Sequence, residues 1–281
     1  MKIIRSIKKM QQLAVQLKKQ GKAIGFVPTM GCLHEGHLSL AKQARLDADI
    51  TVMSIFVNPA QFSPNEDFKK YPRNFKRDCY LAKESGVDII FHPSQNLMYP
   101  KGFQTYIEVE ILSKYLCGKS RPGHFKGVAT IVMKLFNIVN PDIAYFGQKD
   151  AQQARIIRQM ASDLNMDLKI KTMPIVREHD GFAMSSRNAY LSPTQRKDAL
   201  VLKNALQKAK DMINSDEIDV GKIKKQICRI INSVPSLKID YVSVVNADTL
   251  EDIDVIRGRV LIALAVKIGN TRLIDNAIIK R

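Results

Sequence analysis

Two histidines three positions apart, His34 and His37, are the residues of this sequence best suited to chemistry on a phosphate group. They lie in the segment Pro28 to His37, which follows an apolar run and leads into a helical pattern. The amino terminus of a helix offers N–H donors and a partial positive charge, and Gly31 and Gly36 let the backbone approach a ligand closely. The segment therefore predicts a turn that holds a nucleotide phosphate.

Three other kinds of site do not fit this segment. Gly31 to Gly36 has the glycine spacing of a P-loop, but His37 and Leu38 stand where Lys and then Ser or Thr are required. The G-x-G-x-x-G fingerprint of dinucleotide-binding folds is also missing. A metal site on His34 and His37 lacks an evident third ligand nearby, so we predict no metal ligands from the protein.

What remains is the pattern H-x-G-H, spelled by His34, Glu35, Gly36 and His37 after a buried strand. It resembles the signature of the nucleotidyltransferase superfamily, which class I aminoacyl-tRNA synthetases share. Imidazole N–H groups in this place can stabilise the negative charge that spreads over a phosphoryl centre during transfer. The pattern alone has low specificity, and two histidines on an ordinary helix remain the alternative.

Six blocks in order along the chain resemble the pantothenate synthetase family, and together they extend over essentially the whole length. They are Pro28 to His37, Phe56 to Phe62, Tyr71 to Arg73, Arg121 to Val128, Phe146 to Asp150 and Met184 to Asn188. Lys149 can neutralise phosphate charge, and Asp150 can accept from ribose hydroxyls. Ser185, Ser186 and Arg187 also suit phosphate. Taken alone, Lys149 and Asp150 would mark an ordinary helix start, and Ser185 and Ser186 would form a polar hinge.

The resemblance implies an ATP-dependent ligase that condenses pantoate with β-alanine through a pantoyl-adenylate intermediate, using ATP and Mg²⁺. The catalytic residues that it implies are His37, His34, Lys149 and Arg187. The ATP site that it implies consists of Met30, Gly31, Cys32, Leu33, His34, Glu35, Gly36, His37, Gly147, Gln148, Lys149, Asp150, Val176, Met184, Ser185, Ser186 and Arg187. Gln61 and Gln153 would hold pantoate, with Gln61 also near β-alanine, and Arg121 lies in a stretch that resembles a mobile active-site loop. Without the match of the block Phe56 to Phe62, Gln61 would be interpreted as an amide in a surface loop.

Short β-rich runs that alternate with helical patterns must position these residues. The expected strands are Ala23 to Val27, Ile50 to Val57, Val87 to Phe91, Asp142 to Phe146 and Leu168 to Val176. This alternation predicts an α/β fold with a doubly wound, Rossmann-like parallel sheet. Ligands bind such sheets at the carboxyl ends of the strands, so we expect the chemistry in the loops after Val27, Val57 and Phe146. Residues 1–20 have the spacing of a surface helix.

The pattern changes after Ser192 and Pro193, which predicts a smaller α+β C-terminal domain. The expected helices are Thr194 to Asn214 and Val220 to Ile231, and the expected strands are Ile239 to Val245, Val260 to Val266 and Thr271 to Ile279. We therefore predict an ATP- and pantoate-binding domain over residues 1–176 and a lid domain over residues 177–281. The border is inferred from the change of pattern alone.

The composition of the chain sets limits on its class. Its 281 residues, 45% of them apolar, suffice for two cores, and the apolar runs are shorter than the ~20 residues that cross a membrane. Four scattered cysteines without a C-x-x-C pair favour a reduced, cytoplasmic setting. The net charge of +17 would also fit a nucleic-acid-binding protein or a class I aminoacyl-tRNA synthetase-like protein. The six blocks favour small-molecule substrates, no nucleic-acid or membrane partner, and, by resemblance, a homodimer.

Overall fold

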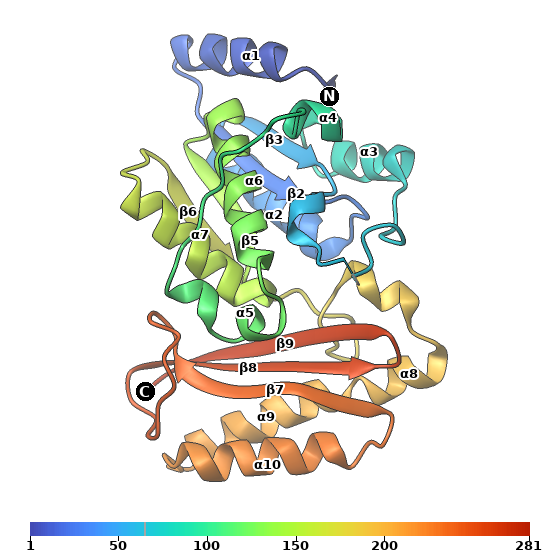
Figure 1. Cartoon of the computed structure of the whole chain (residues 1–281), viewed down its shortest axis with the longest axis vertical. Coiled ribbons are helices and arrows are strands. Elements are labelled where there is room, and N and C mark those ends of the chain that lie inside the picture. The colour runs from blue at the N-terminus through green and yellow to red at the C-terminus, as the bar shows by residue number, and fades with distance from the viewer. Residues whose placement is uncertain (65) are drawn as a thin grey trace. The chain divides into compact units, whose positions relative to one another are not determined.

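Six strands pair in parallel to form one sheet in the computed structural model, which describes residues 1–64 and 66–281. The strands are β1 (Lys2–Ile4), β2 (Ile24–Thr29), β3 (Ile50–Ile55), β4 (Ile89–Phe91), β5 (Ile143–Gly147) and β6 (Lys169–Met173). Their order is β1-β4-β3-β2-β5-β6, so the direction of winding reverses between β2 and β5. The predicted doubly wound parallel sheet is confirmed (Figure 1).

Helices cover both faces of this sheet. They are α1 (Ile7–Lys19), α2 (Glu35–Asp47), α3 (Phe75–Glu84), α4 (Gln95–Met98), α6 (His124–Val139) and α7 (Ala151–Asp163), with the 3-10 turns η1 (Pro59–Gln61), η2 (Leu112–Lys114) and η3 (Gln148–Asp150). One apolar cluster joins α1, α6 and α7 to the sheet, and another joins α2 and α3 to its opposite face. Helix α6 therefore lies across the sheet from α2, which has His34 as its N-cap and His37 in its first turn (Figure 1).

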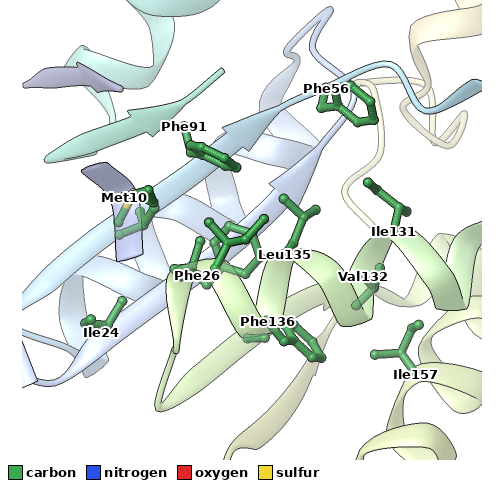
Figure 2. Packing of buried hydrophobic residues seen from close by; sticks show 14 of the residues in the cluster. Met10, Ile24, Phe26, Phe56, Phe91, Ile131, Val132, Leu135, Phe136 and Ile157 are labelled. Carbon is green, nitrogen blue, oxygen red and sulfur yellow. The ribbon is translucent and has the colours of Figure 1, made fainter. Parts of the chain in front are cut away.

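Strand residues alternate between the two clusters, as the pleat of a strand requires. On β2, Phe26 belongs to the cluster with α6, while Val27 belongs to the cluster with α2. Figure 2 shows Phe26 beside Leu135 and Phe136 of α6. The rings of Phe26 and Phe136 meet edge to face with centroids 6.4 Å apart. Burial of an apolar side chain of this size contributes about 1.5–3 kcal/mol, so both faces anchor β2 and the turn that follows it.

A second sheet, antiparallel and three-stranded, forms the core of the C-terminal part. Its strands β7 (Leu237–Asn246), β8 (Arg259–Ile268) and β9 (Thr271–Lys280) are ordered β7-β8-β9. The helical elements that accompany this sheet are α5 (Cys117–Ser120), η4 (Ser186–Tyr190), α8 (Pro193–Asp198), α9 (Val201–Asn214) and α10 (Val220–Asn232). Apolar residues of α9 and α10 form one cluster with β8 and β9. The predicted smaller α+β domain is confirmed.

The chain divides into two compact units, each with its own apolar clusters. Unit 1 comprises Met1–Ser113, Arg121–Gln148 and Gln153–Pro174, and unit 2 comprises Lys114–Ser120, Lys149–Gln152 and Ile175–Arg281. Two short internal segments therefore belong with the C-terminal sheet. The prediction that residues 1–20 form one helix was wrong at its start, because Lys2–Ile4 pair in parallel with β4 before α1 begins. Among the described residues, no helix is both long and apolar enough to cross a membrane.

Candidate active site

The turn that follows β2 is shaped by two residues in the left-handed region of backbone conformation. Gly31 has a φ of 83° and Cys32 a φ of 50°. The hydroxyl of Thr29, at the end of β2, accepts from the N–H of Gly31 at 3.2 Å and donates to the carbonyl of Ser54 on β3 at 2.7 Å. The turn is thus tied to the carboxyl edge of two neighbouring strands.

A buried carboxylate from another helix holds the same turn. Asp78 on α3 is 1% exposed and accepts from the N–H groups of Cys32 at 2.9 Å and Leu33 at 2.8 Å. A Cβ on Gly31 would lie 2.8 Å from Asp78 Oδ2, which explains why glycine is needed there. The backbone N–H groups of Cys32 and Leu33 are therefore used to brace the turn. No local pattern in the sequence points to Asp78, because it lies more than forty positions away.

Asp78→Asn is expected to lower the free energy of unfolding by about 1–3 kcal/mol, because an amide NH₂ would face one of two backbone N–H donors inside the protein. It is also expected to reduce kcat/KM for ATP by roughly tenfold, since the histidines follow directly after this turn. Thermal unfolding and steady-state kinetics measure the two effects. Asp88→Asn is the matched control, because its carboxylate accepts from Thr51 N at 2.9 Å at the amino end of β3. Equal effects of the two variants would remove any special role for Asp78.

The two histidines form the amino-terminal cap of α2 with their Nδ1 atoms. The N–H of Gly36 donates to Nδ1 of His34 at 3.1 Å, and the N–H of His34 donates to Nδ1 of His37 at 3.4 Å. The two rings lie close, with centroids 4.1 Å apart and an angle of 41° between their planes. Because each Nδ1 accepts a hydrogen bond, the neutral rings carry their proton on Nε2. The structure therefore brings the two histidines together and gives both of them an Nε2–H donor.

Gln61 meets this turn from the loop that follows β3. Its Nε2 lies 3.1 Å from Sδ of Met30, so the predicted ATP-site residue Met30 and the predicted substrate residue Gln61 are neighbours. Asn58 orients Gln61, since its Nδ2 donates to Gln61 Oε1 at 3.0 Å and to the carbonyl of Gly127 at 3.1 Å. The phenol of Tyr99 donates to Asn58 Oδ1 at 2.7 Å, and burial raises the pKa of Tyr99, which keeps this donor protonated.

The other predicted residues of unit 1 lie at and beyond the end of β5. Gly147 ends this strand, whose neighbour is β2, and a Cβ there would have nothing within 4 Å. Gln148 follows it and begins η3. Gln153 is half-buried in the first turn of α7, and its position beside a substrate stays a prediction. The reversal of strand order thus falls between the histidine turn and Gly147.

In unit 2, Lys149 is held through its main chain as well as its side chain. Its ammonium group lies 3.9 Å from Asp150 Oδ2, and the Lys149 side chain is 20% exposed. Its carbonyl accepts from Nδ2 of Asn276 on β9 at 2.9 Å, and Asn276 is buried. No sequence pattern indicates Asn276, because a single asparagine in a strand has no motif.

Val176 and the serine-rich segment meet in the same unit. The N–H of Met184 donates to the carbonyl of Val176 at 3.0 Å, and Ser185 Oγ accepts from Arg187 N at 3.3 Å to cap η4. Beside them, the guanidinium of Arg177 forms a fork with the buried Asp275 at 2.7 and 2.9 Å. Val176 and the segment Met184 to Arg187 thus form one local structure.

The predicted site residues therefore fall into two groups, one in each unit. Unit 1 brings together the histidine turn, Met30 and Gln61, and unit 2 brings Val176 together with the serine-rich segment. Asp78 and Asn276, which lie outside the six sequence blocks, support these groups. Asn58 lies within the block Phe56 to Phe62, but no role had been predicted for it. Across residues 1–64 and 66–281, no three His, Cys, Asp or Glu side chains are grouped so that they could hold a metal ion.

The parallel sheet and the histidine turn at its strand-order reversal define a doubly wound α/β enzyme fold. The family model for pantoate-beta-alanine ligase matches residues 2–278. Pantothenate synthetase of Acetivibrio thermocellus is 58% identical over 280 residues, which cover 100% of each chain.

Two solved structures of proteins with these names are also similar to this chain. The crystal structure of pantothenate synthetase from Thermus thermophilus has a TM-score of 0.94 at 40% identity and covers 99% of both chains. Pantoate-beta-alanine ligase from Francisella tularensis, complexed with beta-gamma ATP and beta-alanine, has a TM-score of 0.76 at 35% identity, with 99% of this chain and 97% of that chain covered. The chain belongs to the pantoate–β-alanine ligase family, which confirms the family predicted from the six sequence blocks.

Proposed function

We propose that this chain joins pantoate to β-alanine in an ATP-dependent reaction that gives pantothenate, AMP and pyrophosphate. In the first step, a carboxylate oxygen of pantoate attacks the α-phosphorus of ATP in line, and the bond to pyrophosphate breaks. In the second step, the amine of β-alanine attacks the acyl carbon of pantoyl adenylate, and AMP leaves. Membership of the family over the whole chain supports this reaction, as do the ATP and β-alanine ligands of the Francisella tularensis relative.

The observation that carries the proposal is the use of Nδ1 by both histidines. His34 and His37 cap α2 with Nδ1, so the proton of each neutral ring is on Nε2, from which it can be donated to phosphate oxygens. Such donors stabilise charge that develops in the transition state, and the helix amino terminus adds a partial positive charge. Because the Nδ1 atom of each ring already accepts from the backbone, both rings are oriented before phosphate binds.

Two cations are assigned to the same step. We infer that Lys149 and Arg187 neutralise the triphosphate and the departing pyrophosphate, Lys149 as a point charge and Arg187 through its fork. Asn276 supports the position of Lys149 through the 2.9 Å hydrogen bond to its carbonyl. We propose that the remaining predicted residues of the ATP site also bind ATP, with Val176 near the adenine.

Mg²⁺ enters the proposed reaction as a part of the ATP substrate. The described residues offer no group of three metal ligands, and Mg²⁺ commonly binds proteins through substrate phosphates while keeping several waters. Its chemistry would be to neutralise phosphate charge.

The second step requires that water be kept from the adenylate, because hydrolysis would waste it. We propose that residues 1–176 bind ATP and pantoate and that residues 177–281 act as a lid during this step. Gln61 and Gln153 hold pantoate, and Gln61 also contacts β-alanine. An amide suits this task because it donates and accepts at once. A homodimer acting in the cytoplasm, without a nucleic-acid partner, completes the proposal.

Pyrophosphate release from ATP tests this function directly. Purified protein with MgATP is expected to release pyrophosphate when pantoate is present, and addition of β-alanine is expected to yield pantothenate and AMP in equal amounts. Parallel reactions omit pantoate or replace it with amino acids plus tRNA. Pyrophosphate release that depends on an amino acid and tRNA, or that is the same with and without pantoate, would contradict the proposal.

A further inference from the structure

The guanidinium group of Arg121 lies beside Gln61 and forms two hydrogen bonds with the carboxylate of Glu66. Arg121 donates from Nε to Glu66 Oε1 at 2.6 Å and from Nη2 to Glu66 Oε2 at 2.7 Å. Its Nη2 also lies 3.4 Å from the carbonyl of Gln61. The Arg121 side chain is 13% exposed and that of Glu66 is 23% exposed. Two parallel bonds of this kind are the geometry by which arginine recognises a carboxylate.

The orientation of this guanidinium does not depend on Glu66 alone. Nη1 of Arg121 lies 2.9 Å from Nε2 of His124, and Nδ1 of His124 lies 2.7 Å from the carbonyl of Gln61. The carbonyl can only accept, so His124 carries its proton on Nδ1 and accepts from Arg121 through Nε2. His124 is 9% exposed. Arg121 is therefore aimed by a buried histidine that is itself fixed to the backbone of Gln61.

Glu66 occupies the clamp as a charged group. Burial raises the pKa of Glu66, but hydrogen bonding and the charge of Arg121 outweigh burial and hold the pKa below its usual value. Glu66 lies in the loop that follows η1, and its carboxylate also accepts from Ser63 N in the same loop at 3.1 Å. This loop carboxylate fills a position that a ligand carboxylate could take.

The proposed reaction needs such a position. The carboxylate of pantoate is consumed in the condensation, whereas that of β-alanine survives unchanged in the product. In the proposed function Lys149 and Arg187 face phosphate, so a cation that pairs with this second carboxylate has to be a different residue. Arg121 is hydrogen-bonded to the residue proposed to contact β-alanine.

We propose that Arg121 is the clamp for the carboxylate of the amine substrate, and that Glu66 occupies this clamp as an intramolecular stand-in until β-alanine displaces it. The inference rests on the proposed function and extends it to the amine subsite. Arg121 is then a specificity-determining residue, and Glu66 is a competitor built into the chain. The N–H of Ser63, two positions after Gln61, donates to Glu66, so displacement of Glu66 would also break a hydrogen bond to the segment that carries Gln61.

Glu66→Gln tests the stand-in. The amide places an NH₂ against the guanidinium, which weakens the contact, so the KM for β-alanine is expected to fall by roughly three- to tenfold as competition is relieved. The pantoate-dependent release of pyrophosphate without amine should stay near wild type. Glu108→Gln is the matched control, because it neutralises an exposed carboxylate that pairs with Lys126 at 3.5 Å. An unchanged or raised KM for β-alanine in Glu66→Gln overturns the stand-in and makes the pair a structural brace.

Arg121→Lys tests the clamp, and it keeps the proposal testable if Glu66→Gln folds poorly. Lysine keeps the charge but loses the fork, so the KM for β-alanine should rise roughly 10- to 100-fold. The ratio of kcat/KM for β-alanine to that for its neutral amide, 3-aminopropanamide, should shrink by the same factor. A ratio equal to wild type overturns the clamp. Pyrophosphate release that does not depend on pantoate would instead overturn the proposed function, so the two failures are distinguishable.

Discussion

Replacement of His37 by alanine is expected to slow pantoyl-adenylate formation by roughly 100- to 1000-fold, the effect of removing one donor that stabilises a developing negative charge. The fold should survive, because the hydrogen bond that His37 Nδ1 accepts from His34 N is long, at 3.4 Å, and the side chain is only half-buried. Rapid-quench measurement of the first turnover with pantoate and labelled ATP gives the rate of this step.

Arg45→Ala provides the control for this experiment. Arg45 lies near the carboxyl end of α2, its side chain is 53% exposed, and it pairs with Asp88 at 3.4 Å. Loss of such a surface pair costs about 0–1 kcal/mol, so adenylation should be unaffected. If a folded His37→Ala protein forms the adenylate at the wild-type rate, His37 takes no part in the mechanism.

The strands that position the site were predictable because they are apolar and buried on both faces. Ile24–Thr29, Ile50–Ile55 and Ile143–Gly147 lie within a few residues of the expected runs, and the expected loops follow them. The short strand Lys2–Ile4 was missed, since three residues give no period, and Ile3 matched the helical spacing that truly begins at Ile7. Pairing with β4, far away in the sequence, decides the conformation there.

Motifs indicated the residues that we propose for the chemistry of the site, but they did not indicate the residues that support them from elsewhere in the chain. His34 and His37 belong to a local pattern, and their mutual cap forms within four residues. Asp78 acts on that turn from another helix, and Asn276 reaches Lys149 across more than a hundred positions. A hydrogen bond over such a separation leaves no spacing in the sequence, because only the fold brings its partners together.

The same limit applies to the approach of α6 to the loop that carries Gln61. The carbonyl of Gly127 accepts from Asn58 Nδ2 at 3.1 Å, and the backbone of Ala60 packs directly against the helix. A Cβ on Gly127 would lie 2.0 Å from the carbonyl oxygen of Ala60 and 2.7 Å from Gln61 N. These atoms belong to the main chain, so no side-chain rotation can relieve the overlap.

Gly127→Ala is therefore expected to push the turn at Asn58 to Gln61 away from α6 and to reduce kcat/KM for pantoate by roughly 100-fold, the effect of a displacement of about 1 Å at a reacting group. Overpacking should also cost about 1–3 kcal/mol of stability, seen as a fall in Tm of about 2–4 °C for each kcal/mol. Asn137→Ala, at an exposed position of the same helix, should leave both quantities near wild type. Because alanine is the better helix former, any loss must come from the contact with Ala60 rather than from α6 itself. Wild-type kinetics in Gly127→Ala would show that the position of Gln61 does not limit the reaction.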